Sequence, residues 1–254
     1  MNAGRQDRGP APPGESAPAS VAAVLFDLDG TLLDTAGDLA AALNELRRQE
    51  GLEPLATERI RSFVSHGSAA LVRLAFPGVP EARFLALRDR LLALYSRSLA
   101  VHTRPFEGML ELIEQLEHSA VPWGVVTNKP YSLAAAVLEA VGLARRAGVL
   151  VGGDTLPERK PHPRPLLHAA ELLQVSPAET VYVGDAERDI LAAKAAGMQA
   201  VVASFGYLAP TDDPRAWPAD AWADSPLDIL EWLRSKPLRA RRGSGFESAA
   251  DRSR

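Results

Sequence analysis

The stretch VAAVLFDLDGTLLDT, residues 21–35, decides how this chain folds. It opens with a continuous apolar run, which is typical of a strand that is buried on both faces of a parallel sheet. The run ends at two aspartates one residue apart, Asp27 and Asp29, and a glycine and a threonine follow. Two carboxylates this close repel each other, and burial disfavours their ionised forms further. The sequence therefore predicts a positive partner at this point, and a metal ion is the simplest one.

Four more apolar runs alternate with helical patterns along the chain. They are PWGVVTN (122–128), GVLVGG (148–153), TVYVGD (180–185) and QAVVAS (199–204). Between the runs, apolar residues recur every three or four positions, as one face of an amphipathic helix requires. Strand and helix in alternation predict an α/β fold, a doubly wound parallel sheet with right-handed crossovers.

One interval breaks this alternation. Between the first and second strands, roughly residues 34–105, the patterns are helical only. We expect this interval to form an α-helical cap inserted into a hydrolase-like core made of residues 21–33 and 106–235. Residues 1–20 are rich in proline, alanine and glycine, and we expect them and the basic segment 236–254 to be disordered tails.

Composition and charge exclude several classes of protein. The 254 residues include no cysteine, which rules out disulfides, thiolate nucleophiles and cysteine-bound metals. Six basic and two acidic residues give segment 236–254 a charge of +4, and segment 1–20 is neutral. The net charge of the whole chain is −4, so residues 21–235 carry a net charge of −8. This negative charge argues against broad binding of nucleic acid.

The expected location is the cytoplasm, without membrane contact. No apolar run is long enough to span a bilayer, and the first twenty residues lack the pattern of a signal peptide. The sequence leaves a monomer and a homodimer equally open.

Polar side chains follow three of the predicted strands at the point where each strand ends. Asp27 ends the first run, Thr127 and Asn128 end the second, and Asp185 ends the fourth. In an open parallel sheet, ligands bind in the crevice beyond the carboxyl ends of the strands. We therefore expect these residues to converge on one site.

Each candidate residue also has a purely structural explanation. Asp29 could cap a helix or belong to a turn, Asp185 could be an N-cap, and Lys160, in ERKPHP, could be a solvated loop residue. Asp189 lies four residues after Asp185, so in a helix both would face the same way. We expect Asp189 to orient the site rather than to react.

Taken together, the set matches the chemistry of phosphoryl transfer. A carboxylate that attacks phosphorus forms an acyl phosphate, and a second acid then protonates the leaving group and later activates water. Asp27 suits the first role and Asp29 the second. Hard oxygen ligands, including Asp27 and Asp185, favour Mg²⁺ over zinc. The positive charge and the donors that the phosphoryl group needs would come from Lys160, Thr127 and Asn128.

Four segments, in this order and spacing, resemble the motifs of the haloacid dehalogenase-like hydrolase superfamily: FDLDGTLLDT, VVTNKP, ERKPHP and VGDAERDI. The resemblance covers about residues 21–233. It implies a Rossmann-like core with a helical cap after the first motif. It also implies Asp27 as nucleophile, Asp29 as general acid and base, and Thr127 and Lys160 as phosphate ligands. The same resemblance assigns Mg²⁺ to Asp27, Asp185 and the backbone carbonyl of Asp29.

Within the superfamily, the chain is similar to the bacterial phosphoglycolate phosphatases. The segments PFEGMLELIEQL, WGVVTNKP, GGDTLPERKPHP and DILAAKAAGM carry this narrower resemblance. It implies a small phosphorylated metabolite as partner, with 2-phosphoglycolate first. One departure is Ala186, where many relatives have serine. The alternatives to a phosphoglycolate phosphatase are an N-acetylmuramic acid 6-phosphate phosphatase, a phosphomutase or another sugar-phosphate phosphatase with the same core. A dehalogenase is disfavoured because a leaving halide needs no acid such as Asp29.

The choice of substrate must come from the helical interval. His66, Gly67 and Ser68 lie at an expected helix start, where free amides and an imidazole could meet a second anionic group. The structural alternative is that Ser68 caps the helix and His66 is exposed.

Overall fold

The computed structural model describes residues 20–240, so the two tails predicted for residues 1–20 and 236–254 lie almost entirely outside the described residues. Its main sheet has six parallel strands in the order β5-β4-β1-β6-β7-β8. The strands are β1 (Ala23–Phe26), β4 (Trp123–Val126), β5 (Leu150–Val151), β6 (Thr180–Gly184), β7 (Gln199–Ala203) and β8 (Ala221–Ala223). The predicted α/β fold with a doubly wound parallel sheet is confirmed.

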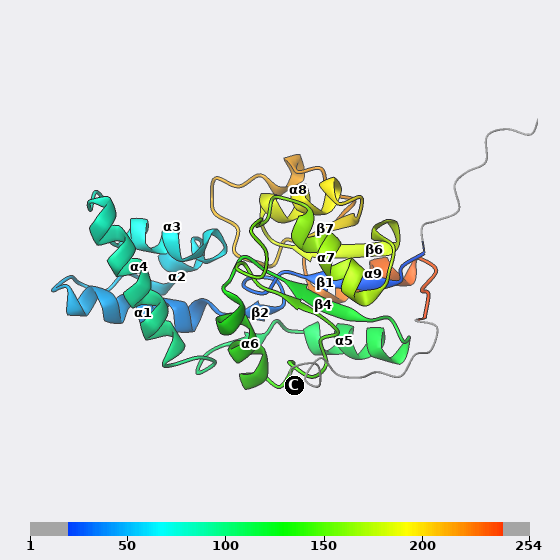
Figure 1. Cartoon of the computed structure of the whole chain (residues 1–254), viewed down its shortest axis with the longest axis horizontal. Coiled ribbons are helices and arrows are strands. Elements are labelled where there is room, and N and C mark those ends of the chain that lie inside the picture. Colours follow the sequence, from blue (N-terminus) through cyan, green and yellow to red (C-terminus); the bar gives the residue numbers. More distant parts are fainter. Residues whose placement is uncertain (1–19, 241–254) are drawn as a thin grey trace, which may run out of the picture.

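Alternate residues of the central strand β1 face two different helical layers. Val24 and Phe26 belong to the hydrophobic cluster on the side of α5, α6 and α9, whereas Ala23 and Leu25 belong to the cluster on the side of α7 and α8. Figure 1 shows α5 below the sheet and α8 above it. These helices are α5 (Met109–His118), α6 (Tyr131–Ala140), α7 (Arg164–Leu173), α8 (Glu187–Ala195) and α9 (Pro226–Arg234). Because both faces are covered, β1 carries a continuous apolar sequence.

The strand β8 was not predicted from the sequence. It contains only three residues, Ala221–Ala223, and it pairs with β7 alone at the edge of the sheet. A short edge strand has little apolar pattern, which explains why the sequence did not reveal it.

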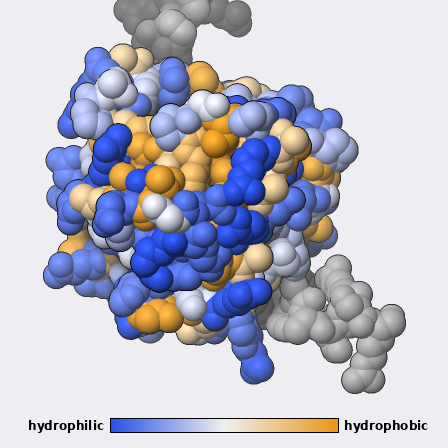
Figure 2. Space-filling model, turned by 90° about the vertical axis from the view of Figure 1, so that its left-hand side faces the viewer, coloured by the Kyte–Doolittle hydropathy of each residue, from blue (hydrophilic) through white to orange (hydrophobic). Residues whose placement is uncertain are grey.

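The helical interval lies at one end of the molecule, at the left of Figure 1. It contains α1 (Ala36–Gln49), α2 (Thr57–Arg61), α3 (Gly67–Ala75) and α4 (Glu81–Ser96). Two short antiparallel strands, β2 (Leu33–Asp34) and β3 (Arg104–Pro105), lie where the chain leaves the core and returns to it. Figure 2 faces this end and shows hydrophobic residues gathered near its centre with hydrophilic residues around them.

The described chain extends a few residues beyond the boundary predicted at Ser235. Val21 and Leu238 form an isolated parallel bridge, and the backbone N–H of Arg239 donates to the carbonyl of Val21 over 2.8 Å. Within residues 20–240, no helix is long and apolar enough to cross a membrane.

The packing of β1 yields a stability prediction. Leu25 is fully buried in the α7/α8 layer, so Leu25→Ala should lower the free energy of unfolding by about 2–5 kcal/mol through lost burial and a cavity. Urea unfolding would measure it. Leu52→Ala serves as the control, because this leucine is 41% exposed and its truncation should cost under about 0.5 kcal/mol. Equal costs for the two variants would contradict the described packing.

Candidate active site

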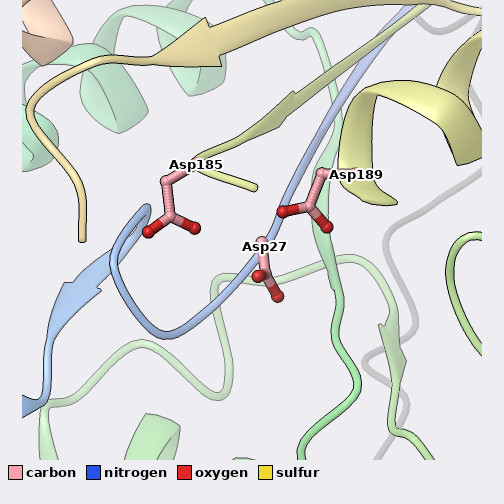
Figure 3. Close-up of side chains that lie close together, drawn as sticks. All are labelled: Asp27, Asp185 and Asp189. Carbon is pink, nitrogen blue, oxygen red and sulfur yellow. The ribbon is translucent and has the colours of Figure 1, made fainter. Parts of the chain in front are cut away.

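Three carboxylates meet at the carboxyl ends of two neighbouring strands. Asp27 follows β1 and Asp185 follows β6, which pairs with β1, while Asp189 lies in the first turn of α8. One carboxylate oxygen from each lies within 4.8 Å of the others, and all three residues are buried. Figure 3 shows the three side chains lying close together. The sheet topology thus brings together residues that are up to 162 positions apart in the sequence.

Lys160 is the cation in direct contact with this cluster. Its Nζ lies 2.9 Å from Oδ1 of Asp27 and 2.7 Å from Oδ1 of Asp189, and it donates a hydrogen bond to the hydroxyl of Tyr182 over 2.7 Å. Burial alone would raise the pKa of Asp27, but Lys160 and Arg188 outweigh burial and lower it. Asp27 is therefore held as a carboxylate, the form in which it could act as a nucleophile.

Asp185 is held by hydrogen bonds rather than by a cation. Its Oδ2 accepts from the hydroxyl of Ser65 over 2.6 Å and from the backbone N–H of Tyr207 over 2.9 Å. Burial, together with the charges of Asp27 and Asp189, raises the pKa of Asp185 to about 7. The N-cap of α8 is Ala186, so the alternative that Asp185 caps this helix is wrong.

Asp189 also has a structural role. Its Oδ2 accepts a hydrogen bond from the backbone N–H of Ala186 over 3.1 Å, which satisfies a free donor at the start of α8. Burial raises the pKa of Asp189 above its ordinary value, although Lys160 opposes this shift.

Close packing at Asp185 requires two glycines. A Cβ on Gly30, which has φ of +88°, would lie 2.1 Å from Oδ2 of Asp185. A Cβ on Gly206 would lie 2.3 Å from the Cβ of the same aspartate. Any side chain at either position would displace this carboxylate, so the glycine of DLDGT is needed for space as well as for conformation.

Asp29 lies beside the cluster in a separate hydrogen-bond network. Its Oδ1 accepts from the hydroxyl of Thr35 over 2.7 Å and from Nζ of Lys129 over 2.8 Å. Lys129 also donates to the hydroxyl of Tyr95 in α4 over 3.0 Å. Burial opposes the charge of Lys129, but Asp29 and Tyr95 outweigh burial and raise its pKa to about 12. The ammonium group is therefore charged and orients the Asp29 carboxyl.

The polar end of β4 joins the same region. The side-chain amide of Asn128 donates from Nδ2 to the backbone carbonyl of Lys160 over 3.0 Å, and its Oδ1 accepts from the backbone N–H of Lys160 over 3.1 Å. These two bonds tie the loop that carries this lysine to the end of β4. The hydroxyl of Thr127 accepts from the backbone N–H of Lys129 over 3.2 Å.

A cavity of about 220 Å³ opens beside these side chains. From the core it is lined by Asp27, Asp29, Thr127 and Asn128, and from the helical interval by His66, Gly67 and Ser68. The helix α3 begins at Gly67, with His66 as its N-cap and no side-chain cap. The structural alternative that Ser68 caps this helix is therefore wrong, although His66 is exposed, as that alternative expected.

Four contributors to the site were missed in the sequence. Lys129 and Arg188 line the cavity, Ser65 contacts Asp185 from the helical interval, and Tyr95 contacts Lys129. Both basic residues stood inside the quoted motifs VVTNKP and VGDAERDI, so proximity to motif residues was the available signal. Ser65 and Tyr95 reach the site through tertiary contacts that no local pattern encodes.

The donor set fits a divalent cation. Among the three buried carboxylates, Asp27 and Asp189 form ion pairs with Lys160. The Oδ1 atoms of these two residues accept no hydrogen bond of normal geometry. All offered ligands are oxygens, which suits a hard metal ion. The residues that would hold such an ion are Asp27 and Asp185, with Asp189 beside them.

Comparisons with known proteins agree with this geometry. Residues 24–203 match the family model described as haloacid dehalogenase-like hydrolase. A crystal structure from Haemophilus somnus, described as a predicted phosphoglycolate phosphatase, superposes with a TM-score of 0.76 at 27% identity, covering 84% of this chain and 97% of that one.

Curated relatives cover most of the chain as well. A phosphoglycolate phosphatase from Xanthomonas campestris is 46% identical over 209 residues, which are 82% of this chain and 95% of that protein. An N-acetylmuramic acid 6-phosphate phosphatase from Pseudomonas putida is 42% identical over 214 residues, 84% of this chain and 96% of that protein. The similarity thus extends over nearly the full length of both relatives.

The raised pKa of Asp185 predicts how stability depends on pH without metal. Because this pKa rises from 3.8 to about 7 on folding, the folded protein binds the proton more tightly, and stability falls as pH rises through that interval. At pH 8 with a chelator, Asp185→Asn should therefore be more stable than the wild type, by about 2–4 kcal/mol.

Urea unfolding at pH 5 and pH 8 would measure this gain, which should shrink at the lower pH. Added Mg²⁺ should stabilise the wild type more than the variant and so reduce or reverse the difference. A variant that is less stable than the metal-free wild type at pH 8 would contradict the described repulsion.

Proposed function

The chain belongs to the haloacid dehalogenase-like hydrolases, and from this premise we propose that it is a phosphatase that hydrolyses 2-phosphoglycolate to glycolate and phosphate. The observation that carries the proposal is the arrangement of Asp27, buried against Lys160, and Asp29, held by Lys129, on the wall of one cavity. Phosphoryl transfer through a carboxylate nucleophile needs a second group that exchanges protons, and Asp29 can serve as that group.

The proposed reaction has two displacements at phosphorus. In the first, a carboxylate oxygen of Asp27 bonds to phosphorus, the bond from phosphorus to the ester oxygen breaks, and Asp29 gives its proton to the departing alcohol. In the second, Asp29 takes a proton from water, the water oxygen bonds to phosphorus, and the acyl phosphate bond to Asp27 breaks. Inorganic phosphate leaves, and both side chains return to their starting states.

The remaining polar residues would bind the phosphoryl group. Lys160 contributes positive charge, and Thr127 and Asn128 contribute donors at the end of β4. A bound Mg²⁺, held by Asp27, Asp185 and the backbone carbonyl of Asp29, would neutralise charge on the phosphoryl oxygens. Phosphatases of this family depend on a metal ion, and we infer Mg²⁺ from the oxygen-only donor set.

The helical interval would act as a cap over this site. Ser65 and Tyr95 contact core residues from it, and His66, Gly67 and Ser68 line the cavity at the start of α3. A closed cap excludes water while the nucleophile attacks. The division into a core of residues 21–33 and 106–235 and a cap of residues 34–105 belongs to this proposal, as does a cytoplasmic location.

A second candidate is an N-acetylmuramic acid 6-phosphate phosphatase, because relatives of that name are almost as similar as the phosphoglycolate phosphatases. The cavity of about 220 Å³ favours the smaller substrate, since ligand pockets for drug-sized molecules are usually about 300–1,000 Å³.

Asp27→Asn should abolish turnover of every phosphate ester, because an amide cannot form the acyl phosphate. Phosphate release, measured with Mg²⁺ present, should fall at least about 10⁴-fold, while the far-UV circular dichroism spectrum should show that the variant is folded. Glu231→Gln, on the solvent-exposed side of α9, is the matched control and should keep full activity. Retained turnover in Asp27→Asn would refute the nucleophile assignment.

A panel of phosphate esters should rank 2-phosphoglycolate first. The panel would compare kcat/KM for 2-phosphoglycolate, N-acetylmuramic acid 6-phosphate, glucose 6-phosphate and glucose 1-phosphate under one set of conditions. A higher kcat/KM for N-acetylmuramic acid 6-phosphate would establish the second candidate instead, and equal constants would indicate a generalist enzyme.

A further inference from the structure

Two basic side chains, Lys129 and Arg188, line the cavity, and they differ in whether a carboxylate of the protein pairs with them. Lys129 is buried, with its Nζ 2.8 Å from Asp29 and in hydrogen-bond contact with Tyr95. Its ammonium group is therefore already engaged in contacts within the protein.

Arg188 has no such partner. It projects from the first turn of α8, donates to the backbone carbonyl of Ser65, and forms no ion pair with a carboxylate of residues 20–240. Its Nε is enclosed and has no hydrogen-bond partner within those residues. A buried donor that lacks an acceptor costs free energy, more so when it belongs to a charged group. An acceptor that arrives with the substrate would remove this cost.

The charges around Arg188 explain why it stays charged without a direct partner. Burial opposes its charge, but Asp189, Asp27 and Asp185 outweigh burial from a longer distance and raise its pKa. The guanidinium thus lies beside the phosphoryl end of the cavity, while Lys160, in contact with Asp27, serves that end directly.

The relatives point to the chemical nature of the missing acceptor. The substrates in their names, phosphoglycolate and N-acetylmuramic acid 6-phosphate, are both phosphate esters of carboxylic acids. A guanidinium offers parallel N–H donors that match a carboxylate in a bidentate pair. The two relatives differ in the size of the acid but share these two anionic groups.

We propose that Arg188 binds the carboxylate of the substrate and thereby selects phosphate esters of carboxylic acids over neutral ones. This inference rests on the proposed phosphatase function and adds a specificity residue to it. Gly67 and Ser68, at the start of α3, line the same cavity. Because Arg188 also donates to Ser65, occupancy of the guanidinium would link substrate recognition to the position of the cap.

The test compares two substrates that differ at one group. 2-Phosphoglycolate and 2-hydroxyethyl phosphate share the phosphate and the two-carbon unit, but the second has an alcohol in place of the carboxylate. For Arg188→Gln, kcat/KM on 2-phosphoglycolate should fall about 10- to 150-fold, mainly through KM, because a charged hydrogen-bonded pair is lost. On 2-hydroxyethyl phosphate the decrease should be much smaller. Arg188→Lys should recover part of the loss, since it keeps the charge without the paired donors.

A matched control is Arg146→Gln. Arg146 pairs with Glu117, which also accepts from the indole of Trp123 at the amino end of β4, away from the cavity. Arg146→Gln should change kcat/KM for neither substrate by more than about twofold. If Arg188→Gln lowers kcat/KM equally for both substrates, Arg188 only holds the cap through Ser65, and the proposal is overturned.

A wrong substrate assignment can be distinguished from a wrong role for Arg188. If the wild type cleaves phosphate esters but does not prefer 2-phosphoglycolate over 2-hydroxyethyl phosphate, the substrate assignment fails. The role of Arg188 would then be tested with N-acetylmuramic acid 6-phosphate and N-acetylglucosamine 6-phosphate, which differ by the lactyl carboxylate. Selectivity that does not depend on Arg188 in either pair would overturn the inference.

Discussion

Repulsion among three buried carboxylates is the interaction on which the rest of this structure depends. Asp27, Asp185 and Asp189 lie within 4.8 Å of one another in a place where water cannot screen them. The sheet imposes this arrangement, because β1 and β6 are neighbours and both end at the same edge. The apolar burial of these strands in two helical layers must therefore outweigh the electrostatic cost. What stabilises the fold and what makes the site reactive are thus in direct opposition, which is usual at catalytic sites.

The surrounding polar groups distribute this charge unequally, and the inequality creates distinct chemical roles. Lys160 touches Asp27 and Asp189 and favours the ionised form of Asp27, whereas Asp185 receives only neutral donors and has its pKa raised. Asp29 lies in a separate network with Lys129. Two carboxyl groups on one short loop, Asp27 and Asp29, are in this way paired with different lysines and held in separate positions.

The sequence predicted the core of the site better than its surroundings, for a physical reason. Asp27 and Asp185 stand where apolar runs end, and parallel strands must end at a common edge, so their convergence follows from pattern and topology alone. Lys129 and Arg188 carry no comparable signal, because a basic residue in a loop or first helical turn is usually solvated. Ser65 and Tyr95 belong to the helical interval, and their contacts with Asp185 and Lys129 depend on how that interval packs against the core. The strand β8 was not predicted, because its three residues are too few to show a hydrophobic pattern.

The two ends of the cavity have separate origins, and this separation explains how closely similar proteins can carry different substrate names. The phosphoryl end is built from strand ends of the core, where any change disturbs the carboxylate cluster and its close contacts with Gly30 and Gly206. The rest of the wall includes His66, Gly67 and Ser68 from the helical interval, and Arg188 contacts that interval through the carbonyl of Ser65. Asp27 follows a strand of the main sheet, and Arg188 belongs to the same helix as Asp189. A change of acid is therefore compatible with an unchanged reaction, provided that the new substrate still offers an anionic group to the guanidinium.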